Sequence, residues 1–241
     1  SDVCSSDLAG SVANNLAELG ANICCYGVIG NDNDGKLLLD DLNGIGVETD
    51  GIIEVSDRPT TVKVRMMGHL QSAGKVIQQI LRIDYEKTDD IEEKIQDEIV
   101  NKIESKVQHV DIILISDMNK GVLSTRILDT VIRLGKDHKV PVIVDPRLSN
   151  DYTIYKGATA ITPNRFETKL STGIKITDIN SMKSAGRKLL EESLFECVII
   201  TADKDGMFLY RKDGSCDLIS TVPKDVYDVS GAGDMVLSIF G

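Results

Sequence analysis

Two glycines and an aspartate near the end of the chain have the types and spacing that phosphoryl-transfer chemistry requires. Gly231, Ala232, Gly233 and Asp234 lead into the apolar run 235–239, which predicts a loop that enters a helix. Free N–H groups and the positive dipole end at a helix start suit an anion. A carboxylate in the first turn, such as Asp234, can accept a hydroxyl proton beside that anion. A structural turn with an aspartate cap is the plainer interpretation of so short a motif.

A second polar pair follows a short apolar segment. Asn164 comes after Thr162-Pro163, and Glu167 lies three residues further on. The plainer interpretation is a helix start, with Asn164 as the cap and Glu167 in the first turn. The same residues would also point to the carboxyl end of a sheet, where ligands of α/β proteins bind. Their oxygen atoms are of the kind that Mg²⁺ prefers.

Further polar residues stand where expected strands end. Asp117 follows the run 112–115 and is a site candidate, although it could also cap the next helix; Ser124 is better placed to do so. Asp145 follows the run 140–144 and is a candidate to position a nucleotide or a metal. Arg147 could neutralise phosphate charge, and a structural salt bridge is an equal alternative. The loop 201–206 is expected to be a tight turn between two strands.

The elements that must position these residues alternate between strand and helix. The expected strands are 23–29, 110–116, 140–144, 158–162 and 197–201, and the expected helices are 11–19, 34–42, 124–134 and 181–192. This alternation predicts an α/β fold with a mostly parallel sheet between helices. Continuous β-branched runs indicate strands that are covered on both faces.

One region breaks the alternation. Residues 52–55, 61–67 and 76–83 have strand character with no helix between them. We predict a small antiparallel β lid over approximately residues 51–84, the alternative being an extra hairpin on the central sheet. The charged helix expected at 92–106 is assigned to the solvated surface.

Composition narrows the class of protein. The chain has 241 residues, which is enough for one large domain, and 41% of them are hydrophobic. The net charge of −11 argues against nucleic acid as a partner. No apolar run is long enough to cross a bilayer. The five cysteines lack metal-ligand spacing, so we expect free thiols in a cytoplasmic protein.

The longer string 225–234, Asp-Val-Tyr-Asp-Val-Ser-Gly-Ala-Gly-Asp, closely resembles the C-terminal signature of the PfkB (ribokinase-like) carbohydrate kinase family. The resemblance implies a ribokinase-like fold, ATP and Mg²⁺ as cofactors, and Asp234 as the catalytic base beside an anion hole formed by the amides of 231–234. It places Asn164 and Glu167 near the metal. The nucleotide contacts that it implies are Asn164, Glu167, Thr201, Asp203, Gly206 and Asp228, with Lys204 as a further candidate.

Four blocks narrow the resemblance to the heptose 7-phosphate kinase subfamily, which in many bacteria forms one half of a bifunctional ADP-heptose synthase. They are 115–121, 144–147, 155–167 and 226–234, and the lid segments 58–65 and 78–84 agree with them. The subfamily phosphorylates the 1-hydroxyl of D-glycero-D-manno-heptose 7-phosphate, on the route to ADP-heptose and the lipopolysaccharide core. The implied substrate-binding residues are Ser11, Lys63, Arg65, Arg82, Asp117 and Lys120. Ordinary solvated strand faces are the alternative for the three basic residues of the lid.

The kinase domain is expected to cover 9–241 and to be incomplete at both ends. Residues 1–8 resemble a translated sequencing-adapter remnant, so we expect them to be non-native. The family's first strand and its sugar-binding aspartate are not found, and Ser11 stands where the family has asparagine. The exposed face of the lid predicts a homodimer. Two other hypotheses are another PfkB kinase, acting on ribose, fructose phosphate or a nucleoside, and a non-catalytic sugar- or nucleotide-binding regulator.

Overall fold

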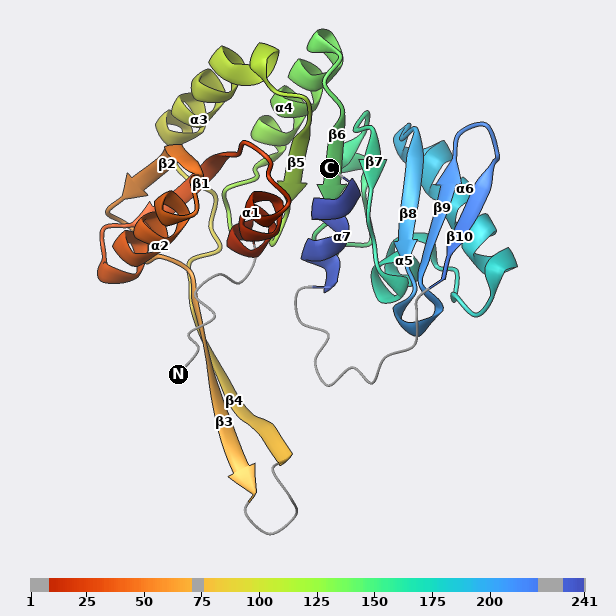
Figure 1. Cartoon of the computed structure of the whole chain (residues 1–241). Helices are drawn as coiled ribbons and strands as arrows, with labels where there is room; N and C mark the ends of the chain where they lie inside the picture. The colour runs from red at the N-terminus through yellow and green to blue at the C-terminus, as the bar shows by residue number, and fades with distance from the viewer. Residues whose placement is uncertain (1–8, 71–75, 221–231, 241) are drawn as a thin grey trace.

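The computed structural model describes residues 9–70, 76–220 and 232–240, and in these ranges helices flank a central sheet (Figure 1). Six strands form this sheet in the order β10-β9-β8-β7-β6-β5. Their bounds are β5 Ile113–Ser116, β6 Val142–Asp145, β7 Ala160–Ile161, β8 Cys197–Thr201, β9 Met207–Arg211 and β10 Cys216–Ile219. Strands β5 to β8 run parallel, while β9 and β10 each pair antiparallel with the strand before. The predicted α/β fold with a mostly parallel sheet is confirmed.

Helices cover both faces of this sheet. They are α1 Ala9–Glu18, α2 Asn33–Gly44, α3 Glu93–Lys106, α4 Thr125–His138, α5 Arg165–Thr172, α6 Ile179–Ser193 and α7 Ala232–Phe240, with 3₁₀ turns η1 Val107–His109, η2 Thr153–Tyr155 and η3 Asp203–Asp205. Val142 and Val144 of β6 belong to the core cluster that includes α4 and α6. Ile143 between them packs instead with Val12 of α1 and Leu237 of α7. Because both faces are covered, the strand is a continuous apolar run.

Strands β1 Cys24–Gly30 and β2 Glu48–Val55 form a separate parallel pair. The sequence had suggested that 52–55 belongs to the lid, and this assignment is wrong. Ile53 pairs with Val28 of β1 and is buried in the main core cluster, so apolar burial holds β2 in the body. The predicted lid range therefore includes one strand of the body.

The lid itself consists of β3 Val62–Leu70 and β4 Val76–Tyr85, which pair antiparallel. Figure 1 shows this hairpin projecting from the body, at the end toward which β5 and β6 point. The predicted antiparallel lid is confirmed. None of the helices in the described ranges combines the length and apolar character needed to span a membrane.

Candidate active site at the carboxyl end of the sheet

Asp234 lies in the first turn of α7, and only 7% of its surface is exposed. The start of α7 lies at the end of the molecule toward which β5 and β6 point (Figure 1). A Cβ atom added to Gly233 would lie 3.9 Å from Asp145 Oδ2, so the helix start faces the end of β6. Ser238 further along α7 donates a hydrogen bond to Val12 O at 3.4 Å, which ties α7 to α1. The chain therefore places a buried carboxylate at a helix start beside the strand ends.

The structure describes only some of the other residues predicted in this loop. Ala232 begins α7, while Gly231 and Asp228 lie outside the described residues, as do residues 1–8. Ser11 lies half-buried in α1, the helix that packs on α7. The anion hole and the substrate contact of Ser11 stay predictions.

Asp145 ends β6 and is surrounded by other acidic residues. Thr162 donates a hydrogen bond from Oγ1 to Asp145 Oδ1 at 3.0 Å. Burial is the largest cause of a pKa of about 7 for Asp145; the charges of Glu167, Asp234 and Asp117 add to the increase, and the Thr162 hydrogen bond opposes it. Three acidic residues thus act on Asp145, and a bound cation would stabilise its ionised form.

Asp117 follows β5 and is only 3% exposed. Its Oδ2 accepts a hydrogen bond from the Tyr155 hydroxyl at 2.7 Å, and its Oδ1 accepts one from the Asn119 N–H at 2.9 Å. Arg147 Nε lies 4.0 Å from Oδ2, and its Nη1 donates to Asn119 Oδ1 at 3.0 Å. Ser124, as predicted, caps α4 instead of Asp117. The salt-bridge interpretation of Arg147 therefore has direct support.

Asn164 and Glu167 begin α5 as a capping box. Asn164 Oδ1 accepts from the Glu167 N–H at 2.9 Å, and Glu167 Oε2 accepts from the Asn164 N–H at 2.8 Å. The predicted helix start is confirmed. Burial raises the pKa of Glu167, and its hydrogen bonds with Asn164 oppose that shift. Their role toward magnesium stays a prediction.

The predicted nucleotide loop leaves β8 at Thr201 and forms the 3₁₀ turn η3. The predicted tight turn between two strands is confirmed, because β9 returns antiparallel. Gly206 has φ +91°, and a Cβ there would lie 2.0 Å from Ile219 O, so a side chain would strain this position. Asp203 also has positive φ, at +50°.

Sequence reasoning missed Arg165, which holds this loop. Its Nη2 donates to Ala202 O at 3.0 Å, its Nε lies 3.2 Å from Asp203 Oδ2, and it pairs with Asp205. The sequence did carry a signal for this contact, because Arg165 directly follows Asn164 and the loop 201–206 contains two aspartates. A cation at that helix start can fix an acidic loop against it.

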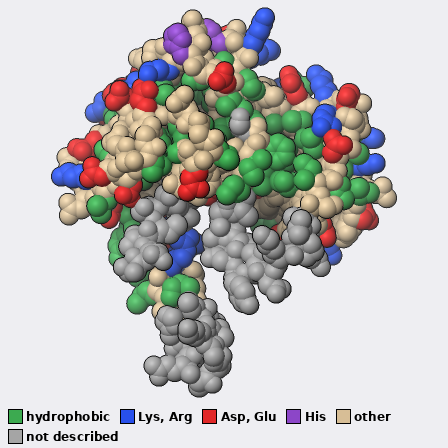
Figure 2. Space-filling model, in the orientation of Figure 1, with side chains coloured by type: hydrophobic (Ala, Val, Ile, Leu, Met, Phe, Trp, Pro, Cys, Tyr) green, Lys and Arg blue, Asp and Glu red, His purple; other side chains and the backbone are tan. Residues whose placement is uncertain are grey.

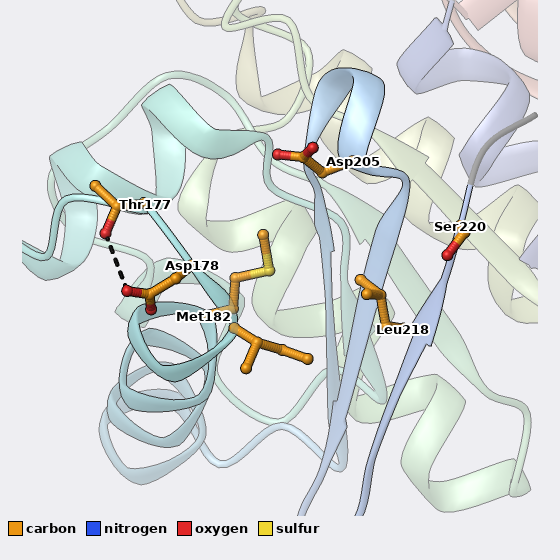
Figure 3. A pocket seen from close by; sticks show the side chains of 7 residues that line it. Thr177, Asp178, Met182, Asp205, Leu218 and Ser220 are labelled. Atoms are coloured by element: carbon orange, nitrogen blue, oxygen red, sulfur yellow. Dashed lines mark hydrogen bonds between the residues drawn. The ribbon is translucent and has the colours of Figure 1, made fainter. Parts of the chain in front are cut away.

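A cavity of about 370 Å³ opens beside the same loop, between the start of α6 and β10 (Figure 3). It is lined by Thr177, Asp178, Ile179, Met182, Asp205, Leu218 and Ser220. Of the predicted site residues that the structure describes, none lines it, although Asp205 belongs to the loop 201–206. The candidate site is therefore defined by the buried carboxylates and not by this cavity.

The base of the lid is tied to the loop after β5. Lys120 Nζ lies 2.6 Å from Glu86 Oε1, just beyond β4. Arg58, 7% exposed, donates to Asp89 O at 2.8 Å and to Lys87 O at 3.1 Å. A Cβ on Gly121 would lie 1.9 Å from Asp89 O, so the segments are in close contact. Lys120 is thus placed between the lid and the strand ends.

The three basic residues predicted on the lid share one face. In the β3–β4 register Lys63 lies opposite Asp84, and Arg65 lies opposite Arg82 two residues further along the strands. Arg82 Nε lies 2.9 Å from Asp84 Oδ1, and its side chain is half exposed. In Figure 2 a basic surface lies beside hydrophobic side chains on the lid. The structure groups these cations, and their contact with substrate stays a prediction.

The fold and the buried carboxylates at its strand ends agree with the sugar kinase class that the sequence predicts. The chain belongs to the pfkB family of carbohydrate kinases, whose sequence pattern matches residues 9–240. It is 41% identical over 233 residues to the bifunctional protein HldE of Geobacter metallireducens and 39% identical to that of Geobacter sulfurreducens. Each match covers 97% of this chain and 46% of the relative, so the chain spans about half the length of these proteins.

Solved structures show the same fold. Arabidopsis thaliana ribokinase in complex with ribose and ATP has a TM-score of 0.73 and 22% identity, over 96% of this chain and 72% of that one. Phosphofructokinase-2 from Escherichia coli, in complex with substrates and products, has a TM-score of 0.72 and 16% identity, over 95% of this chain and 71% of that one. The predicted ribokinase-like fold and family are confirmed.

Proposed function

We propose that this chain is the kinase part of an enzyme that transfers the γ-phosphoryl group of ATP to the 1-hydroxyl of D-glycero-D-manno-heptose 7-phosphate, in the cytoplasm. The observation that carries a kinase function is the buried Asp234 at the start of α7, facing the end of β6. The choice of heptose as the substrate rests on the sequence blocks around the site and on the relatives named HldE. The product would serve ADP-heptose synthesis.

In this proposal Asp234 accepts the proton of the attacking sugar hydroxyl. The backbone amides around the start of α7 stabilise the charge that develops on the moving phosphoryl group. The loop 201–206, held by Arg165, contacts the nucleotide. The lid closes over the sugar and keeps water from the transferred group.

The oxygen atoms of Asn164, Glu167 and Asp145 are of the kind that would hold a magnesium ion. In the described part of the chain, no three carboxylate, histidine or cysteine side chains come close enough to hold a metal by themselves. Asn164 and Glu167 use part of their hydrogen-bonding capacity in the capping box of α5. Asp145 is a buried carboxyl with a raised pKa. When bound, the ion neutralises phosphate charge. Glu167 and Asn164, together with Asp145, would hold the ion.

The phosphate already on the sugar needs a second anion site. Lys63, Arg65 and Arg82 lie on one face of the lid, which brings three cations together. We assign this face to the 7-phosphate and Asp117 with Lys120 to the sugar. Exposed ion pairs such as Arg82 with Asp84 contribute little to stability, so the cations can be redirected to a ligand at small cost.

The opposite face of the lid supports a homodimer. Val64, Met66, Leu81, Ile83 and Tyr85 alternate with the basic residues, and each is between 37% and 55% exposed. A row of exposed apolar side chains of this kind is typical of an interaction surface. Of the related folds, Escherichia coli phosphofructokinase-2 is tetrameric in one inhibited form.

We expect Leu81→Glu to convert the dimer to monomer in sedimentation velocity. The control is Leu19→Glu, which places the same charge at an exposed leucine outside the lid. A wild-type protein that sediments as a monomer at all concentrations would refute lid pairing.

Kinase function is tested by offering the complete gene product ATP, Mg²⁺ and a panel of heptose 7-phosphate, ribose, fructose 6-phosphate and a nucleoside. Phosphorus NMR of the products shows which hydroxyl is modified. Transfer to the heptose 1-hydroxyl supports the proposal. Transfer to ribose alone would assign the chain to another kinase of the family, and nucleotide binding with no transfer would favour a binding protein.

A further inference from the structure

Tyr155 is buried among core residues, yet its hydroxyl reaches the site. The ring has no exposed surface and lies 6.0 Å from the ring of Tyr152. Its hydroxyl donates to Asp117 Oδ2 at 2.7 Å and accepts from the Arg147 N–H at 3.1 Å. One side chain thus connects the loop after β5 with the loop after β6.

A phenylalanine would fill the same space, so packing alone does not account for the hydroxyl. Burial raises the pKa of Tyr155 well above its usual value, and the nearby charge of Asp117 raises it further. The hydroxyl therefore stays protonated and acts as a permanent donor to the carboxylate. A hydrogen bond to a charged acceptor is stronger than a neutral one.

The hydrogen bond from Tyr155 holds Oδ2 of Asp117 and leaves Oδ1 available to the loop. Asp117 Oδ1 is held by the Asn119 N–H, and Asn119 has φ +56°, a conformation that needs support in a non-glycine residue. Asn119 in turn accepts from Arg147. Tyr155, Asp117, Asn119 and Arg147 form a closed ring of contacts that sets the shape of the loop 117–121.

We propose that Tyr155 is a positioning residue for sugar binding: it holds Asp117 and the loop 117–121 in the conformation that receives the sugar hydroxyls. This inference rests on the proposed sugar kinase function. Tyr155 touches no substrate in this role and acts through Asp117. Loss of the Tyr155 hydroxyl should therefore weaken the binding of the sugar and leave the binding of the nucleotide unchanged.

The test compares Tyr155→Phe with Tyr152→Phe in the complete gene product. Both substitutions remove one hydroxyl from a buried tyrosine, and none of the hydrogen bonds that the structure describes for Asp117 involves Tyr152. We expect Tyr155→Phe to raise KM for the sugar about tenfold or more, the loss of one charge-assisted hydrogen bond, with KM for ATP unchanged. Tyr152→Phe is expected to leave both KM values unchanged.

Action through Asp117 is tested by a double-mutant cycle. In the Asp117→Ala background, Tyr155→Phe should no longer weaken sugar binding, measured by calorimetry. An undiminished effect of Tyr155→Phe in that background overturns the proposal, as does an unchanged KM for the sugar in the single variant.

A second readout does not depend on catalysis. Amide hydrogen exchange at Asn119 and Arg147 is expected to speed up in Tyr155→Phe and not in Tyr152→Phe. Equal exchange in both variants overturns the positioning role. A wild type that phosphorylates no sugar contradicts the proposed function, and the exchange data still decide whether Tyr155 holds the loop.

Discussion

Two aspartates end neighbouring strands of the same sheet, and their surroundings differ. Asp117, after β5, accepts hydrogen bonds from Tyr155 and Asn119 and has Arg147 at 4.0 Å. Asp145, at the end of β6, accepts one from Thr162 and is surrounded by acidic groups that help raise its pKa to about 7. The backbone joins them directly, because the Asp117 N–H donates to Asp145 O at 3.0 Å.

The difference indicates a division of labour. A carboxylate whose oxygens are already held by donors has a fixed direction, which suits recognition of sugar hydroxyls. A buried carboxyl with few donors gains most from a cation, which suits the phosphate and metal side of a kinase site. We therefore propose that these two aspartates serve different purposes, which only their neighbours distinguish.

The largest expected effect is that of Asp234→Asn. Removal of a general base typically costs a factor of about 10² to 10⁴ in turnover, so kcat should fall by that amount with nucleotide binding retained. Because the charge of Asp234 is one cause of the raised pKa of Asp145, the variant should also lower that pKa. Retained turnover would remove Asp234 from its assigned role.

Asp145→Asn should change how stability depends on pH. The pKa of Asp145 is higher in the folded protein than the ordinary 3.8, so its ionisation costs stability. That cost is absent at about pH 4, grows as pH rises toward about 7 and then stays constant. We therefore expect the melting temperature of the variant to exceed that of the wild type increasingly from about pH 4 to 7.

The control for this experiment is Asp178→Asn. Asp178 is an exposed helix cap with a lowered pKa, so its loss should weaken the protein most at neutral pH, the opposite trend. A melting-temperature difference for Asp145→Asn that does not vary with pH would contradict the raised pKa.

The smallest expected effect is that of Thr162→Val, which removes the donor to Asp145. Loss of one hydrogen bond costs about 1 kcal/mol in the free energy of unfolding. Since that bond lowers the pKa of Asp145, its loss should move the pH midpoint of the stability change upward. Chemical denaturation at several pH values measures both, and an unmoved midpoint would show that Thr162 does not influence Asp145.

Local spacing predicted part of this site well. Asn164 and Glu167 form the expected capping box, and Ser124 caps α4 as expected. Caps depend on residues three positions apart, so the sequence carries them directly. The strand-end positions of Asp117 and Asp145 were also predictable from apolar runs that stop at a polar residue.

Long-range partners were not predictable in this way. Tyr155 and Asp117 are 38 residues apart, and Arg165 meets Asp205 over 40 residues. Neither pair follows from the period of a helix or a strand. The wrong assignment of 52–55 to the lid has the same origin, because the pairing of β2 with β1 depends on burial in the body.

The sequence by itself determined most of the strands and helices, the helix starts, the family and the placement of acidic residues at strand ends. The tertiary structure decided which carboxylate is firmly held and which has a raised pKa, and how the lid base meets Lys120. The reason is physical: periodicity and caps are local properties of the chain, whereas burial, charge neighbours and hydrogen bonds across the sheet exist only once distant segments have packed together.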